Sequence, residues 1–454
     1  MYITVFLLFG TMLVALGWAA NATRSTPALK AAWSPYNVLL VLLAVFVLDF
    51  AFLSGIGYTT IFRGGTAVYD DQIVWSFVVF FTFGLCAIVG MHAARLPLLT
   101  PTVKRLPTGV VRFHILLWTI PAAVIVAVIY RQTGGNLLAM QYSRQVILRE
   151  IPAVYLCSYV TLAAAVYWAA SARFKLLDLT VLAFYSIALF SFGGRSFLLL
   201  VIVALAINVC NKKGWMPGRL SLIFAVPILV LAISASYFFL REDDQSSGFF
   251  GYVSSQGGVV DASFGTADIS LADALHFSTL YDGPRSIQNF LLGPLLFPVP
   301  RSLMSEKPEG TSTNFTRYFD PLRWALTGGS QVVTTGFGDV YINAGYLLGI
   351  PIIIAVFWWF GRNTIMGFRA GGPGGIYLVV FTLYWLYVFI RSDVFNLAPT
   401  LWIVAGLHFY FRVLVAMLPV RQKSPRLSPA GKQVPVGLAP DGGHYPVVAR
   451  QNPQ

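Results

Sequence analysis

The chain has 454 residues, of which 57% are hydrophobic and only 11% are charged. This composition argues against an ordinary soluble domain, in which about a quarter of the residues are charged. The formal net charge of +13 would indicate a nucleic-acid partner in a soluble protein, but here most of the excess lies in short connections between apolar runs. We therefore expect a membrane protein in contact with lipids, and no nucleic-acid partner. Its three cysteines all lie within apolar runs, which argues against a disulfide framework.

Eleven apolar runs recur along the chain and predict an all-α polytopic membrane fold. A helix needs about 20 residues to cross about 30 Å of hydrocarbon, and most of the runs approach this length. Basic clusters occupy alternate connections, as expected for helices that cross in alternating directions. The predicted spans are residues 2–20, 37–54, 73–91, 113–130, 151–170, 176–192, 196–210, 220–240, 341–360, 376–390 and 397–418.

The connections on the two sides of these spans differ in charge. Basic residues dominate one side, whereas nearly all acidic residues outside the spans lie on the other. Under the positive-inside rule the basic side is cytoplasmic, so the N-terminus is predicted to be outside and the C-terminus inside. The predicted organisation is spans one to eight in residues 1–240, a large outer loop in 241–340, three further spans in 341–420 and a disordered cytoplasmic tail in 421–454.

The predicted sixth and seventh spans are short and meet at the turn Gly193-Gly194-Arg195. At about 1.5 Å per residue, each helix covers only roughly 26 Å, so this turn should lie slightly below the outer surface of the bilayer. A guanidinium at that depth must face protein or water, and such residues are candidates for function. The alternative for Arg195 is a side chain that extends to the lipid head groups.

Cationic side chains recur on the outer side, where positive charge is topologically disfavoured. Each one alone is explained as a solvated charge, but together they indicate an anionic ligand, because the planar fork of arginine binds phosphate oxygens in pairs. Within the long loop, residues 268–281 have helical apolar spacing and 286–297 are apolar enough for the membrane interface. The candidate binding residues on this side are Arg144, Arg149, Arg241, Arg285, Arg301, Lys307 and Arg391, with His276 as a candidate base.

Several motifs are absent, and this narrows the chemistry. The sequence has no Walker A motif and no His/Cys cluster with zinc spacing, so we expect neither a cofactor nor a metal site. The cytoplasmic connections are too small for a nucleotide-sugar transferase domain. A substrate that reacts outside the membrane must carry its own activation, and a lipid-linked pyrophosphoryl sugar meets that requirement.

Three local patterns resemble those of Wzy-type polymerases, the bacterial polymerases of O-antigen and exopolysaccharide repeat units. They are Gly194-Arg195 opening a span, Pro300-Arg301 followed by Lys307-Pro308, and the run from Asp339 through Asn343 to Gly345 before the ninth span. Their order, with a long outer loop before the last three spans, also resembles this family. Similar proteins more often carry Glu at the position of Asp339.

The resemblance implies a GT-C-like membrane glycosyltransferase of the bacterial inner membrane, with the long loop in the periplasm. Its substrate would be an oligosaccharide repeat unit on undecaprenyl pyrophosphate, and a polysaccharide co-polymerase that regulates chain length is a candidate partner. Arg195 and Arg301 would stabilise the pyrophosphate leaving group without a metal, and Asp339 would act as the general base.

Three alternatives remain open from the sequence. An O-antigen ligase would use the same donor with a different acceptor, and a lipid-linked glycan flippase would move the donor without making a bond. For Asp339 itself, the alternative is a helix N-cap or a favourable charge at a helix start, with His276, Asp282 and Glu306 as substitute bases.

Overall fold

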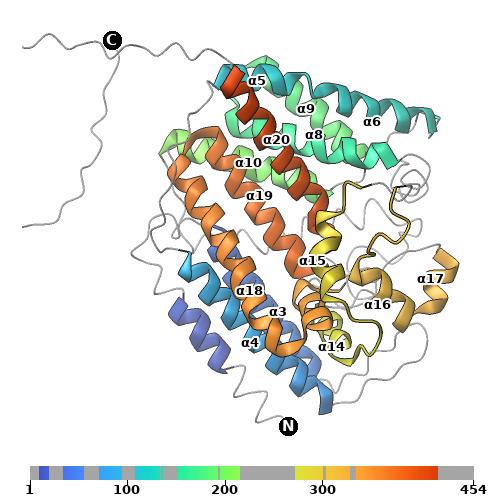
Figure 1. The fold of residues 1–454 in the computed structure, drawn as a ribbon. Helices are drawn as coiled ribbons and strands as arrows, with labels where there is room; N and C mark the ends of the chain where they lie inside the picture. The colour runs from blue at the N-terminus through green and yellow to red at the C-terminus, as the bar shows by residue number, and fades with distance from the viewer. Residues whose placement is uncertain are drawn as a thin grey trace, which may run out of the picture.

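The structure, a computed structural model, describes residues 10–19, 34–55, 71–94, 108–132, 134–135, 152–192, 195–214, 271–299, 303–327 and 334–417. These residues form helices joined by turns and short connections (Figure 1). The helices are α3 (Pro35–Gly55), α4 (Asp71–Ala93), α5 (Thr108–Leu116), α6 (Thr119–Gln132), α8 (Pro152–Ser171), α9 (Leu176–Ser191), α10 (Arg195–Lys213), α14 (Leu271–Leu280), α15 (Ile287–Leu295), α16 (Thr311–Phe319), α17 (Pro321–Thr327), α18 (Gly336–Ala370), α19 (Gly372–Arg391), the 3₁₀ helix η2 (Val394–Leu397) and α20 (Ala398–Met417).

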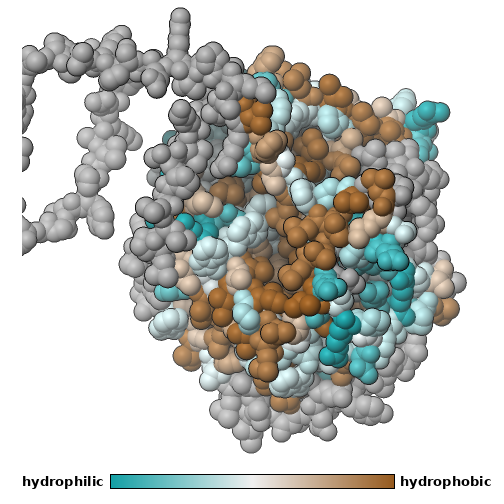
Figure 2. All heavy atoms as spheres, viewed as in Figure 1, coloured by the Kyte–Doolittle hydropathy of each residue, from teal (hydrophilic) through white to brown (hydrophobic). Residues whose placement is uncertain are grey.

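Six helical segments among the described residues are long and apolar enough to cross a membrane. Large apolar side chains are exposed on many of the helices, and they cover much of the surface seen in Figure 2. A soluble protein rarely exposes apolar patches of this extent, whereas lipid covers them in a membrane. An all-helical membrane protein is therefore confirmed for the described residues. The count of eleven spans stays a prediction, and the predicted span 220–240 lies outside the described residues.

Helix α18 packs closely against α4, and glycines permit the close approach. A Cβ atom on Gly90 of α4 would overlap the backbone of α18, and one on Gly361 of α18 would overlap Ala94 and Met91. Helices in lipid gain no hydrophobic driving force from one another, so they associate where small residues let the backbones come together. The glycines of these two helices therefore permit a closer backbone approach than larger side chains would.

Aromatic side chains fill the centre of the bundle formed by α3, α4, α18 and α19. Phe337 and Phe389 lie edge to face with ring centroids 5.8 Å apart, and Phe357 contacts both rings. Phe46 and Phe80 stack against each other at 4.9 Å and close the cluster. Such pairs prefer offset and edge-to-face geometries, so this cluster orients the first turn of α18, which carries Phe337.

Helix α18 is broken near its beginning. Gly345 has φ 70°, a left-handed conformation that glycine adopts at no steric cost, and it separates a short first part from the long apolar part that follows. The break places Asp339 on the short first part. The predicted ninth span began at residue 341, whereas the helix begins five residues earlier, at Gly336.

The four helices α14 to α17 pack at the end of the bundle where α18 begins and α19 ends (Figure 1). We call this end, which also includes the connection 391–398, the loop end. Helices at the predicted positions 268–281 and 286–297 are present as α14 and α15. The residues of α14 from Leu271 to Ser278 are all buried, and the helix contacts α18, α4 and α3.

Candidate functional site

The carboxylate of Asp339 is the centre of a buried polar cluster at the loop end. Its side chain is 1% exposed. Oδ1 accepts hydrogen bonds from the Thr311 hydroxyl and from Asn343 Nδ2, the latter at 2.8 Å. Oδ2 accepts a hydrogen bond from the backbone N–H of Val394 at 2.7 Å. One side chain thus joins α16, α18 and η2, which are distant in the sequence.

A second buried carboxylate, Asp393, lies beside the first and interacts with it electrostatically. It accepts hydrogen bonds from the backbone N–H of Ser312 at 3.0 Å and from the side chain of Asn396 at 2.6 Å. It also caps η2 through the backbone N–H of Asn396 at 3.2 Å. Burial raises the pKa of Asp393 above its ordinary value, against the opposing effect of these donors. The pair therefore places two buried carboxylates in one polar cluster.

The start of α18 is held by residues other than Asp339. Thr335 is the N-cap, and its hydroxyl accepts a hydrogen bond from the backbone N–H of Gly338 at 3.0 Å. A Cβ atom on Gly338 would overlap Ser278 of α14, and one on Gly336 would overlap the carbonyl oxygen of Phe389. The interpretation of Asp339 as a helix N-cap is therefore wrong, because its carboxylate bonds across to other elements.

Asn343 extends the cluster by one helical turn. Its Nδ2 donates to Asp339 and to the Thr311 hydroxyl, both at 2.8 Å, and its Oδ1 accepts from the backbone N–H of Ser286 at 3.4 Å. Thr311 and Asn343 are both half-buried, whereas Asp339 is buried. Three segments of the chain are thus connected through two side chains of α18.

His276 lies apart from this cluster, on the buried helix α14. Its Nδ1 is 2.7 Å from the hydroxyl of Ser76 on α4, and its Nε2 has no hydrogen-bond partner among the described residues. Burial lowers the pKa of His276 to about 4, so the ring is neutral at pH 7. The geometry gives it a packing and hydrogen-bonding position between α4 and α14, while its role as a base stays a prediction.

Lys307 binds the end of α15 instead of extending into solvent. Its Nζ donates to the carbonyl oxygens of Phe297 at 2.7 Å and Val299 at 3.0 Å, and it lies 5.3 Å from the centre of the Phe297 ring. Carbonyl groups after a helix end lack partners within the helix, and a lysine is a common way to satisfy them. Its role in substrate binding stays a prediction.

Two further predicted arginines lie at the loop end. Arg285 is half exposed and donates to the carbonyl oxygen of Tyr281 at 2.8 Å. Arg391 closes α19 and donates to the hydroxyl of Tyr387 at 2.7 Å. Arg391 is two residues from Asp393 in the chain, and Arg285 precedes Ser286, whose backbone N–H donates to Asn343. These contacts place the backbone beside both arginines, and not their guanidinium groups, next to the polar cluster.

The remaining predicted residues lie outside what the structure describes. Arg144, Arg149, Arg241 and Arg301 fall in undescribed segments, and the side chain of Arg195 is also undescribed, although its backbone begins α10. Their roles stay predictions. Among the described residues, no three His, Cys, Asp or Glu side chains come together as a metal site would require.

Comparisons with protein-family models, characterised proteins and solved structures find no match to this chain. The functional assignment therefore depends on the residues and their arrangement.

The sequence alone did not indicate the partners of Asp339. Thr311 and Ser312 belong to a polar segment of the loop, where a Thr-Ser pair carries no specific signal. Asp393 had one signal, namely an acidic residue directly after a span, beside Arg391. Only the docking of α16 against α18 and η2 makes these residues one cluster.

Proposed function

We propose that the protein polymerises oligosaccharide repeat units carried on undecaprenyl pyrophosphate, at the outer face of a bacterial inner membrane. The observation that carries the proposal is the Asp339 cluster. It joins the outer-loop helix α16, the start of α18 and the connection after α19 in one buried group. Helix α16 follows the motif Pro300-Arg301…Lys307-Pro308, and the start of α18 contains the motif from Asp339 to Gly345, both of which resemble Wzy-type polymerases. All three segments belong to the predicted outer side.

The chemistry of this substrate fits the residues of the loop end. Cleavage at the sugar–pyrophosphate bond leaves negative charge on the lipid pyrophosphate, which fixed arginines stabilise without a metal. Arg391 and Arg285 lie at this end, and Arg195 and Arg301 are the further candidates. The new glycosidic bond forms from an acceptor hydroxyl, whose proton needs a base.

Asp339 is the base in this proposal, and Thr311 gives the proton its route. The carboxylate is buried, so an acceptor hydroxyl reaches it through the half-buried Thr311 hydroxyl that is already hydrogen-bonded to it. The proton of the acceptor passes to Thr311 as the Thr311 proton passes to Asp339. In the absence of substrate, Asp339 fixes α16 against α18.

A second candidate function is a proton-coupled flippase for the same lipid-linked glycan. The observation that favours it is the pair Asp339 and Asp393, because buried carboxylates that interact are a common basis for proton coupling in membrane transporters. The pair lies at one end of the bundle, whereas transporters usually place such groups near the midplane. We therefore rank this function second.

One reconstitution experiment separates these functions. The full chain is placed in proteoliposomes with undecaprenyl-pyrophosphate-linked repeat units extracted from the source organism, with and without lipid A. Longer lipid-linked chains support the polymerase. Transfer to lipid A would instead identify an O-antigen ligase, and a change of sidedness without new bonds would identify a flippase.

The variant Asp339→Asn tests the assigned base. Asn keeps the size of the side chain but cannot take up the proton, so polymerisation should fall at least about 100-fold, the lower range for general base catalysis. Glu309→Gln, a charge-removing change on the same loop, is the matched control and should keep activity. Full activity of Asp339→Asn in folded protein would restrict Asp339 to fixing α16.

A further inference from the structure

The turn between α8 and α9 presents cations beside exposed apolar side chains. Arg173, Phe174 and Lys175 are all exposed, and Leu176, which follows them, is 81% exposed. Phe174 has φ 61°, and no other non-glycine residue in the described part of the chain has a positive φ. A bulky residue in this conformation costs energy and persists only where its surroundings hold it.

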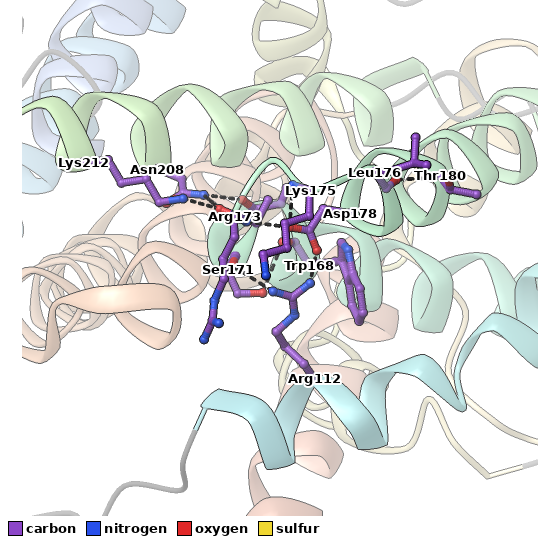
Figure 3. A network of polar contacts seen from close by, with 12 residues as sticks. Arg112, Trp168, Ser171, Arg173, Lys175, Leu176, Asp178, Thr180, Asn208 and Lys212 are labelled. Atoms are coloured by element: carbon purple, nitrogen blue, oxygen red, sulfur yellow. Dashed lines mark hydrogen bonds and ion pairs between the residues drawn. The ribbon is translucent and has the colours of Figure 1, made fainter.

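An ion pair between the half-buried Arg112 and the buried Asp178 holds the turn (Figure 3). Asp178 accepts hydrogen bonds from the backbone N–H groups of Arg173 at 2.6 Å and Lys175 at 3.4 Å, one on each side of Phe174. Arg112 donates to the same carboxylate and lies 4.3 Å from the centre of the Trp168 ring. The carboxylate of Asp178 therefore both fixes the backbone of the turn and pairs with Arg112.

Helix α10 holds the other side of the turn. Asn208 Nδ2 donates to the carbonyl oxygens of Ala169 at 2.9 Å and Ala172 at 3.0 Å. Lys212 donates to the Ala172 carbonyl and lies 4.8 Å from the centre of the Phe174 ring. The end of α10, which also carries the exposed Lys213, is therefore fixed beside the turn.

The charge around this turn is unbalanced. Five basic residues (Arg112, Arg173, Lys175, Lys212 and Lys213) surround one acidic residue, Asp178, which is buried. In Figure 3 the side chain of Arg173 extends away from the hydrogen-bonded group. The exposed cations thus lie next to exposed leucines, an arrangement that suits a membrane interface.

We propose that this turn is a binding site for the phosphate of an anionic phospholipid. Arg173 would bind the phosphate oxygens through its planar fork, with Lys175 and Lys213 adding charge. Phe174 and the leucines that follow would lie against the glycerol and the upper acyl chain. The left-handed conformation of Phe174 is the device that presents an aromatic ring between two cations, and the buried contacts of Asp178 stabilise it.

Native mass spectrometry of the full chain in an uncharged detergent tests this proposal. The probes are dioleoyl-phosphatidylglycerol, dioleoyl-phosphatidylcholine and inorganic phosphate. We expect the wild type to retain phosphatidylglycerol at least several-fold more than phosphatidylcholine. Arg173→Gln should remove most of this preference, whereas Arg369→Gln, which removes an exposed arginine from the last turn of α18, should keep it.

Each further outcome decides between sources and roles. If millimolar inorganic phosphate displaces the lipid, the site binds free phosphate and the proposal of a lipid site is wrong. Equal losses in Arg173→Gln and Arg369→Gln would show a general effect of charge and would also overturn it. Arg173→Lys keeps the charge without the fork and should retain an intermediate amount of phosphatidylglycerol. A fold check by circular dichroism accompanies each variant.

Discussion

Acidification should destabilise the protein through His276, and the sign follows from the direction of its pKa shift. The folded protein holds the pKa of His276 at about 4, whereas the unfolded chain has the ordinary value of 6.5. Between these values the unfolded state binds more protons, so the stability contributed by the neutral ring is complete above pH 6.5 and is lost as the pH falls toward 4.

The magnitude follows from the two pKa values. Linkage gives a loss of about 2 kcal/mol in the free energy of unfolding between pH 7 and pH 5. The cause is burial, because His276 is 3% exposed and its Nε2 has no partner among the described residues to stabilise a second proton. Its Nδ1 is already hydrogen-bonded to the Ser76 hydroxyl.

The assay compares unfolding of the full chain in detergent at pH 7 and pH 5, for wild type and for His276→Asn. Asn retains a polar atom near the position of Nδ1 but has no proton to take up, so the change in stability between the two pH values should shrink by about 2 kcal/mol. Ser76→Ala keeps the buried imidazole and should keep the pH dependence. If His276→Asn and the wild type lose the same stability between the two pH values, the reasoning from burial is wrong.

Three other substitutions test the packing and polar contacts described above, each by thermal unfolding of the purified chain. Gly336→Ala should cost about 1–3 kcal/mol, because the new methyl group meets the fixed carbonyl of Phe389; an unchanged midpoint would contradict this close approach. Thr335→Ala should cost about 1 kcal/mol by removing the N-cap of α18, and Thr335→Ser should restore most of it. Arg112→Gln should cost about 3 kcal/mol or more by leaving Asp178 buried without its partner, and a neutral effect would show that the backbone donors alone satisfy this carboxylate.

The membrane helices could be predicted from the sequence, because an apolar run of span length has few other structures open to it in lipid. The positions of α4, α8, α9 and α19 agree with the predicted runs within a few residues. The start of α18 at Gly336 was not predicted, because Thr335, Gly336 and Asp339 resemble a loop when read alone. Their helix forms because Thr335 caps it and the aromatic core holds Phe337.

The candidate site was predictable only in part. Asp339 was identified because the run from Asp339 through Asn343 to Gly345 resembles a motif of Wzy-type polymerases. Its contacts with Thr311 and Val394 cross 28 and 55 residues of chain, and no local pattern encodes such pairings. Lys307 was assigned to an anionic ligand from its charge, but the carbonyl groups that surround it depend on how α15 ends, which a charge pattern does not reveal.

The break at Gly345 has a consequence for how the protein fits into its bilayer. The helix beyond it, residues 346–370, has 25 residues and a length of about 37 Å at 1.5 Å per residue. This exceeds a hydrocarbon core of about 30 Å, so the helix must tilt or thicken the lipid around it. A left-handed glycine separates this long part from Gly336–Ala344, but the stacked rings of Phe337 and Phe357 hold the two parts together. A change in the tilt of the long part would therefore reach the first part of the helix, which carries Asp339.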